Sequence, residues 1–116
     1  VMYVIGEVEG KTAIIIDDII DTAGTLVNGV DALLAKGAKA VYAACTHPVL
    51  SPPAYERIAG SALKELVVTD TIPLRPGAPD DKIVVLSTAG ILADTIRNVF
   101  ADESVSELFE GENQLF

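Results

Sequence analysis

Short apolar runs alternate with amphipathic stretches along the chain, and the first pair is the clearest. Residues 12–16 are β-branched or apolar and end at Asp17 and Asp18, which predicts a strand buried on both faces that breaks into a polar loop. A helix is expected after the loop, because apolar residues recur at its spacing: Leu26, Val30, Leu33 and Leu34. Lys36 and Gly37 are typical of a helix end. The predicted order is strand, loop, helix.

The same alternation continues toward residue 100. Further strands are expected at residues 38–45, 64–69 and 82–87, and further helices at residues 52–59 and 89–100. The last helix should turn an apolar stripe toward the core, made of Ile91, Leu92, Thr95, Ile96 and Val99.

This order of elements predicts a fold class and the position of a ligand site. Residues 73–81 contain three prolines, one glycine and two aspartates, so they should form a surface loop within one domain. Alternating strands and helices predict an α/β fold, a Rossmann-like layer with a mainly parallel sheet. In such folds ligands bind at the carboxyl ends of the strands, where loops are expected to begin at Asp17, Thr46 and Thr69.

Composition narrows the function classes. The 116 residues fit one domain spanning residues 1–116, and 50% hydrophobic against 22% charged residues indicates a globular chain. A net charge of -9 argues against nucleic-acid and anionic-membrane partners. No apolar run approaches the ~20 residues that cross a bilayer, and Cys45 is the only cysteine, so we expect a cytoplasmic protein without an internal disulfide. Because the chain starts at Val1 rather than at a methionine, we interpret it as a fragment.

The first loop carries the most specific chemistry. It joins an apolar strand to a helix amino terminus, where unpaired N–H groups and the helix dipole favour an anion. A phosphate monoester is the predicted ligand of the segment Asp21, Thr22, Ala23, Gly24 and Thr25. Ala23 and Gly24 leave room for phosphate oxygens, and Thr22 and Thr25 each offer a hydroxyl donor.

The acids around this loop should have other roles. A carboxylate against a phosphate dianion is repulsive, so Asp21 is expected to accept hydrogen bonds from the loop's own N–H groups. Asp17 and Asp18 offer acceptor oxygens suited to the paired hydroxyls of a ribose, or to magnesium held by that sugar. The pattern thus predicts a site for ribose 5-phosphate. The simpler interpretation is a capped helix in which the acids serve as N-caps or as surface charge.

The nine residues from Asp17 to Thr25 resemble the signature of the phosphoribosyl pyrophosphate-binding family, which includes type I phosphoribosyltransferases and ribose-phosphate pyrophosphokinases. Further segments resemble the pyrophosphokinases and keep their order along nearly the whole chain: residues 8–11, 45–51, 69–73 and 104–109. The resemblance implies a type I phosphoribosyltransferase fold, of which this chain is a carboxy-terminal domain fragment.

By this resemblance, the intact enzyme transfers the pyrophosphoryl group of ATP to the anomeric hydroxyl of ribose 5-phosphate and releases AMP, with magnesium as cofactor. It would form a homo-oligomer with regulatory sites at interfaces. Asp17 and Asp18 would bind the ribose hydroxyls and residues 21–25 the 5-phosphate. Ser104, Ser106 and Phe109 would match a tail that helps form an allosteric site, although by themselves they are typical of a terminal turn. A phosphoribosyltransferase and a non-catalytic, synthetase-associated regulatory subunit remain alternatives.

Cations for phosphoryl transfer are scarce near the predicted loop. Only Lys11 and Lys36 are expected there, and Lys36 lies at the far end of the helix. The catalytic Lys or Arg, the ATP pocket and the metal ligands should therefore lie outside this chain, so we assign no catalytic residue and expect the fragment alone to be inactive. His47 is the only histidine and has no local acidic partner, which favours a structural role.

Overall fold

The computed structural model describes residues 4–102, 104 and 105 of the chain. The chain divides into two compact units, Val1–Leu86 and Ser87–Phe116, which we describe separately. The expectation of one domain over residues 1–116 therefore stays a prediction. Among the described residues, no helix combines the length and apolar character needed to cross a membrane.

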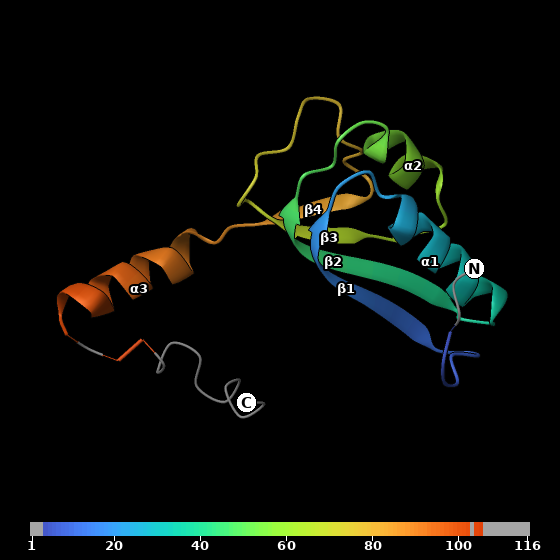
Figure 1. Cartoon of the computed structure of the whole chain (residues 1–116), viewed down its shortest axis with the longest axis horizontal. Coiled ribbons are helices and arrows are strands. Elements are labelled where there is room, and N and C mark those ends of the chain that lie inside the picture. The colour runs from blue at the N-terminus through green and yellow to red at the C-terminus, as the bar shows by residue number, and fades with distance from the viewer. Residues whose placement is uncertain (1–3, 103, 106–116) are drawn as a thin grey trace. The chain divides into compact units, whose positions relative to one another are not determined.

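The first unit is an α/β layer built on a four-stranded parallel sheet in the order β1-β2-β3-β4 (Figure 1). The strands are β1 (Thr12–Ile20), β2 (Ala40–Pro48), β3 (Leu66–Thr69) and β4 (Ile83–Leu86), and the helices are α1 (Gly24–Ala35) and α2 (Ala54–Gly60). α1 connects β1 to β2 and α2 connects β2 to β3, whereas the proline-rich segment at residues 73–81 leads to β4 without a helix. The predicted order of elements and the parallel sheet are confirmed.

The core lies between the sheet and the two helices. Leu26 and Val30 from α1 and Ile58 from α2 are buried against the inner face of the strands. On that face, the buried strand residues alternate along the chain, as a pleated strand requires: Val41, Ala43, Cys45, Leu66 and Val68. Burying each large aliphatic side chain contributes about 1.5–3 kcal/mol, so this single layer of contacts is the main stabilising term of the first unit.

Helix α1 ends as the sequence predicts. Gly37 has φ 87°, a left-handed conformation that costs glycine little and other residues more. Its N–H donates to the carbonyl of Leu34 at 2.9 Å, and the N–H of Ala38 donates to the carbonyl of Leu33 at 3.1 Å. These bonds satisfy carbonyls of the last helical turn and direct the chain into β2.

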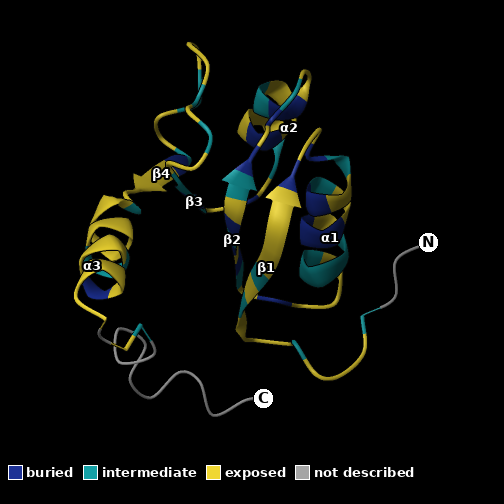
Figure 2. Cartoon of the chain, turned by 60° about the vertical axis from the view of Figure 1, so that its left-hand side comes forward, coloured by how far each residue is buried: buried dark blue, intermediate teal, exposed yellow. Residues whose placement is uncertain are grey.

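The other face of the sheet is open within the first unit, which corrects the prediction that the first strand is buried on both faces. Ile14 is 65% exposed and Ile16 is 81% exposed. The reason is that α1 and α2 pack on one face only, and successive side chains of a strand point to opposite faces. Figure 2 shows β1 as largely exposed on the side turned to the viewer.

A second correction concerns where β1 ends. The strand continues four residues past Ile16 to Ile20, paired with β2 as far as Pro48, so Asp17 and Asp18 belong to the strand and the loop begins at Asp21. Likewise β2 runs to Pro48, beyond the predicted end at Cys45.

In the second unit, α3 (Ala89–Phe100) has the predicted bounds, but its apolar stripe is not buried. Ile91, Leu92, Ile96 and Val99 are 55–59% exposed, and the expectation that they face the core stays a prediction. Periodicity identifies the apolar face of a helix, and it does not identify the element that covers that face. The buried residue of α3 is Asn98, whose side-chain amide donates to the carbonyl of Ser104 at 2.9 Å.

Candidate functional site

The loop between β1 and α1 is fixed at both ends. Ile20, the last residue of β1, is buried, and its carbonyl accepts the N–H of Leu50 at 3.1 Å. Ala23 is buried as well and has φ 58° and ψ 11°, a left-handed conformation that turns the chain into α1. Since such a conformation costs a residue with a Cβ roughly 1–2 kcal/mol, the surrounding contacts must hold the loop in this shape.

The loop presents a helix amino terminus whose N–H groups are open. The first helical bond runs from the N–H of Val27 to the carbonyl of Ala23 at 3.0 Å. Among the described residues, the N–H groups of Gly24, Thr25 and Leu26 donate to no backbone carbonyl. The helix has no side-chain cap and no acid in its first turn. The interpretation of the neighbouring acids as N-caps is therefore wrong, and the free donors and the positive end of the helix dipole stay available to an anion.

A cavity of about 270 Å³ lies against this terminus and brings most of the predicted site residues together. It is lined by Asp17, Ile19, Ile20, Asp21, Thr22, Ala23, Gly24, Thr25 and Leu26. Asp18 is not part of this lining, because it follows Asp17 within a strand and its side chain leaves the opposite face. A more apolar cavity of about 310 Å³ shares Asp17 and Thr25 and extends along α1 toward Leu33.

The carboxylates of the site differ in their partners. Asp17 accepts the N–H of Asp18 at 2.9 Å, and Asp18 accepts the N–H of Ile19 at 2.8 Å, each through one oxygen. Within the described part of the chain, the second oxygen of each has no protein partner. The expectation that Asp21 accepts bonds from the loop's N–H groups is wrong, since its exposed carboxylate makes no hydrogen bond with any described residue.

The two threonines of the loop keep their hydroxyls available. Thr22 and Thr25 are exposed, and both line the cavity. Neither side-chain hydroxyl forms a hydrogen bond to a residue that the structure describes. Two hydroxyl donors and the open N–H groups of α1 thus surround one cavity, which is the donor set that a phosphate group needs.

The structure also brings Arg57 to this loop, a residue that sequence reasoning missed. Its Nη1 donates to the carbonyl of Thr22 at 2.9 Å and lies 3.1 Å from the position that a Cβ on Gly24 would occupy. The expectation that Lys11 and Lys36 are the only cations nearby is therefore wrong. One signal was available: parallel β-α-β units place the amino termini of successive helices at the same sheet edge, and Arg57 is the fourth residue of α2.

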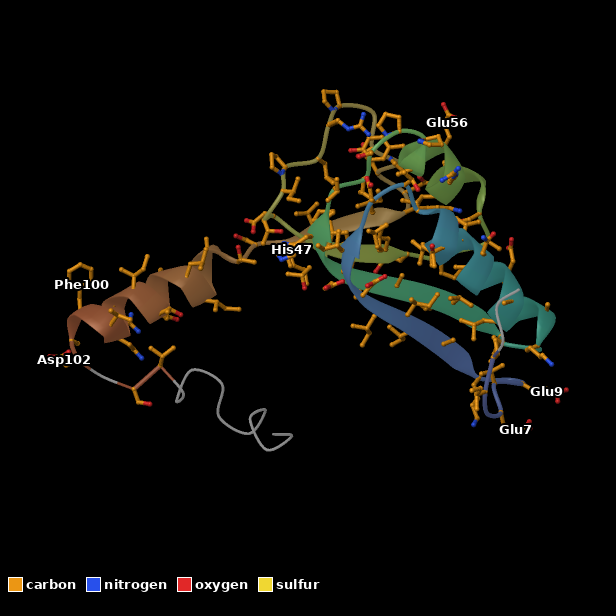
Figure 3. The ribbon with its side chains drawn as sticks, in the orientation of Figure 1. Glu7, Glu9, His47, Glu56, Phe100 and Asp102 are labelled. Carbon is orange, nitrogen blue, oxygen red and sulfur yellow. The ribbon has the colours of Figure 1, made fainter. Side chains whose placement is uncertain are left out.

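The ends of β2 and β3 meet in a cluster of hydroxyls beside His47, which Figure 3 labels. Nδ1 of His47 lies 2.9 Å from Oγ1 of Thr71, and Thr71 and Thr69 donate to the carbonyl of Thr46 at 2.9 and 2.6 Å. These bonds are consistent with the predicted structural role of His47. No group of three His, Cys, Asp or Glu side chains suited to a metal occurs among the described residues.

Cys45 is buried directly behind the site. Burial raises the pKa of its thiol, a backbone hydrogen bond with Ile20 lowers it, and the charge of Asp17 raises it further. The thiol therefore stays protonated and unreactive at neutral pH. Of the predicted regulatory residues, Ser104 is exposed and its carbonyl accepts the bond from Asn98, whereas Ser106 and Phe109 lie outside the described residues.

Comparison with known proteins shows the family and the fold of the chain. Residues 1–110 match the family model described as phosphoribosyl synthetase-associated domain. Ribose-phosphate pyrophosphokinases of Clostridium tetani and Staphylococcus saprophyticus are 54% and 59% identical over 110 residues, which is 95% of this chain and 34% of each relative. A crystal structure of phosphoribosylpyrophosphate synthetase from Mycobacterium smegmatis matches 84% of this chain and 33% of its own, with a TM-score of 0.81 and 46% identity. The predicted fold is confirmed, and the chain spans about a third of the length of these relatives.

Proposed function

The chain belongs to the phosphoribosyl synthetase-associated domain family, and from this premise we propose that it is the ribose 5-phosphate-binding part of a ribose-phosphate pyrophosphokinase. The observation that carries the proposal is the cavity at the start of α1, where open N–H groups, two threonine hydroxyls and the Asp17 carboxylate line one space. Donors at one end suit a phosphate, and an acceptor at the other end suits sugar hydroxyls.

In the proposed complex, the 5-phosphate lies at the amino terminus of α1. The N–H groups of Gly24 and Thr25 and the hydroxyls of Thr22 and Thr25 donate to its oxygens. Asp17 accepts a bond from a ribose hydroxyl through the oxygen that has no protein partner. Asp18 lies on the opposite side of the strand and would reach the sugar only from outside the cavity lining.

Magnesium is the proposed cofactor, and the donor set fits it in part. Asp17 lines the cavity and keeps one carboxylate oxygen without a partner among the described residues, whereas Asp18 lies on the opposite face of the strand. Magnesium in phosphoryl-transfer sites can be held by one carboxylate together with substrate oxygens and water, so Asp17 would supply one of its ligands. When bound, the metal would neutralise charge on the reacting phosphates.

The whole enzyme is proposed to transfer the pyrophosphoryl group of ATP to ribose 5-phosphate, giving phosphoribosyl pyrophosphate and AMP. We further propose that it is a cytoplasmic homo-oligomer without nucleic-acid or membrane partners. Among the described residues, Arg57 donates to the loop from outside the cavity, and no Lys or Arg lines the cavity itself. Because the transferred group needs more positive charge than this, we expect no AMP release when the chain alone is mixed with magnesium, ATP and ribose 5-phosphate.

The test of the proposed site is calorimetric titration of the chain with three ligands: ribose 5-phosphate, ribose and inorganic phosphate. Ribose 5-phosphate should bind most tightly, because only it reaches both the donors of the loop and Asp17. Inorganic phosphate should compete with it, whereas ribose should bind too weakly to measure. Absence of ribose 5-phosphate binding, or binding that inorganic phosphate does not displace, would contradict the proposed site.

A further inference from the structure

Arg57 is the cation that approaches the phosphate loop from outside the motif. It lies on α2, and its guanidinium donates to the carbonyl of Thr22 at 2.9 Å. The side chain is exposed, and it forms no ion pair with any residue that the structure describes. Glu56, its neighbour on α2, projects outward from the helix (Figure 3). The positive charge of Arg57 is therefore not neutralised by a neighbouring acid.

The direction of the hydrogen bond decides what Arg57 does to the loop. A trans peptide is planar, with its carbonyl and the following N–H pointing in opposite directions. When the Thr22 carbonyl points at Arg57, the N–H of Ala23 points away from it. Thr22 and Ala23 line the cavity, whereas Arg57 donates to the loop without being part of that lining.

Gly24 leaves the space that the guanidinium of Arg57 occupies. A Cβ at Gly24 would lie 3.1 Å from Nη1 and 3.7 Å from Cζ of Arg57. Gly24 has no positive φ, so it is not needed for an unusual backbone conformation. Its missing side chain therefore admits Arg57 against the loop, in addition to any room it leaves for phosphate oxygens.

We propose that Arg57 is a positioning residue of the phosphate site. Its guanidinium holds the Thr22–Ala23 peptide with the Ala23 N–H toward the 5-phosphate and sets a positive charge behind the loop. The hydrogen bond to a charged donor also polarises that peptide, which strengthens the N–H as a donor on the other side. This inference rests on the proposed function, because it assigns the phosphate of that same ligand to the cavity.

The test compares the chain with three variants by calorimetry with ribose 5-phosphate and by the amide resonance of Ala23. Arg57→Met keeps an apolar stem of similar length and removes the charge and the donor. Arg57→Lys keeps a charge and a donor that can reach the Thr22 carbonyl. Lys36→Ala is the matched control, because it removes an equal charge at the far end of α1.

Arg57→Met should bind ribose 5-phosphate about tenfold more weakly, which is the expected size for a charged hydrogen bond that is open to solvent. Arg57→Lys should stay within about threefold of the parent and Lys36→Ala within about twofold. The Ala23 amide should shift on ligand addition in the parent and shift less in Arg57→Met, a readout that a merely structural role would not move.

The outcomes separate this inference from the proposed function. If the parent binds ribose 5-phosphate and Arg57→Met binds it equally well, or if Lys36→Ala is equally damaging, Arg57 has no positioning role and the proposed function stands. If the parent binds neither ribose 5-phosphate nor inorganic phosphate, both fall together. If Arg57→Met does not fold, the parent chain still tests the inference. An amide resonance of Ala23 that does not shift when ribose 5-phosphate binds would overturn it.

Discussion

Replacing Thr25 by valine isolates one donor of the proposed phosphate site. Thr25 is the second residue of α1, it is exposed, and it lines both cavities at the loop. Valine has nearly the same shape and the same branching at Cβ, so the backbone of the first helical turn is unchanged. Because the hydroxyl has no partner among the described residues, its removal should change the free energy of unfolding by less than about 0.5 kcal/mol.

The effect on binding should be much larger than the effect on stability. A neutral hydroxyl that donates to a charged phosphate oxygen contributes about 1–3 kcal/mol, so the dissociation constant of ribose 5-phosphate should rise by about 5- to 150-fold. The cavity is open to solvent, which places the expected loss toward the lower end of that range. The open N–H groups of α1 remain in the variant, so binding is weakened rather than abolished.

Calorimetry with ribose 5-phosphate measures the loss, and chemical denaturation measures the stability of the same samples. Thr25→Ser is the matched control: it keeps the hydroxyl, and its affinity should stay within about threefold of the parent. An unchanged dissociation constant for Thr25→Val, in a chain that binds ribose 5-phosphate, would refute the assignment of the phosphate to the start of α1.

Three further predictions concern the neighbouring structure. Asp17→Asn should weaken the binding of ribose 5-phosphate about tenfold and reduce the effect of magnesium on that binding. If calorimetry gives the same dissociation constant for the variant and the parent, Asp17 is not a ligand of the sugar or the metal. Gly37→Ala should lower the free energy of unfolding by about 1–2 kcal/mol, since φ is 87° and the new Cβ would lie 3.1 Å from Cγ of Glu9. Denaturation should show no comparable loss for Gly60→Ala, where the added Cβ meets open space. Burial raises the pKa of the Cys45 thiol above its ordinary value of 9.0. The free energy of unfolding should therefore not depend on this thiol below pH 9.0 and should fall above it, because the thiol of the unfolded chain loses its proton first. Chemical denaturation of a Cys45→Ala variant should lack that fall.

The sequence predicted those parts of the fold that depend on neighbouring residues along the chain. Gly37 follows the C-cap residue Lys36 because a left-handed residue is needed at that position, which is a local requirement. The loop between β1 and α1 was predicted for the same reason: Ala23, Gly24 and Thr25 are adjacent in sequence and line one cavity. The order of strands and helices followed from hydrophobic periodicity together with the glycine and proline residues between the elements.

The end of β1 was misjudged because pairing between strands overrides local polarity. Asp17 and Asp18 look like the start of a loop, yet Asp17 pairs with Cys45 and the ladder continues to Ile20 and Pro48. The extra residues change the site, since they place consecutive acids on opposite faces of a strand. The residue types within one strand do not reveal how many of its residues pair with the neighbouring strand.

Arg57 was missed for a related reason. It is 35 residues from Thr22 along the chain and meets it only because α1 and α2 begin at the same edge of the sheet. Counting cations within the motif therefore underestimates the charge near the loop. The fold class itself supplies the missing rule: a basic residue in the first turns of the next helix belongs to the candidate site.

The exposed apolar face of the sheet has a physical cause. Ile14 and Ile16 were expected in a core and are more than half exposed. Hydrophobic periodicity predicts which side chains of a helix or strand are apolar on one face, but not which other element packs against that face. In the first unit, α1 and α2 already occupy one face of the sheet, so their apolar stripes cannot also cover the other. These residues are apolar and periodic, but no helix of the first unit packs on them. Val30 and Ile58 are apolar and do pack against the sheet, so their side chains are fully buried.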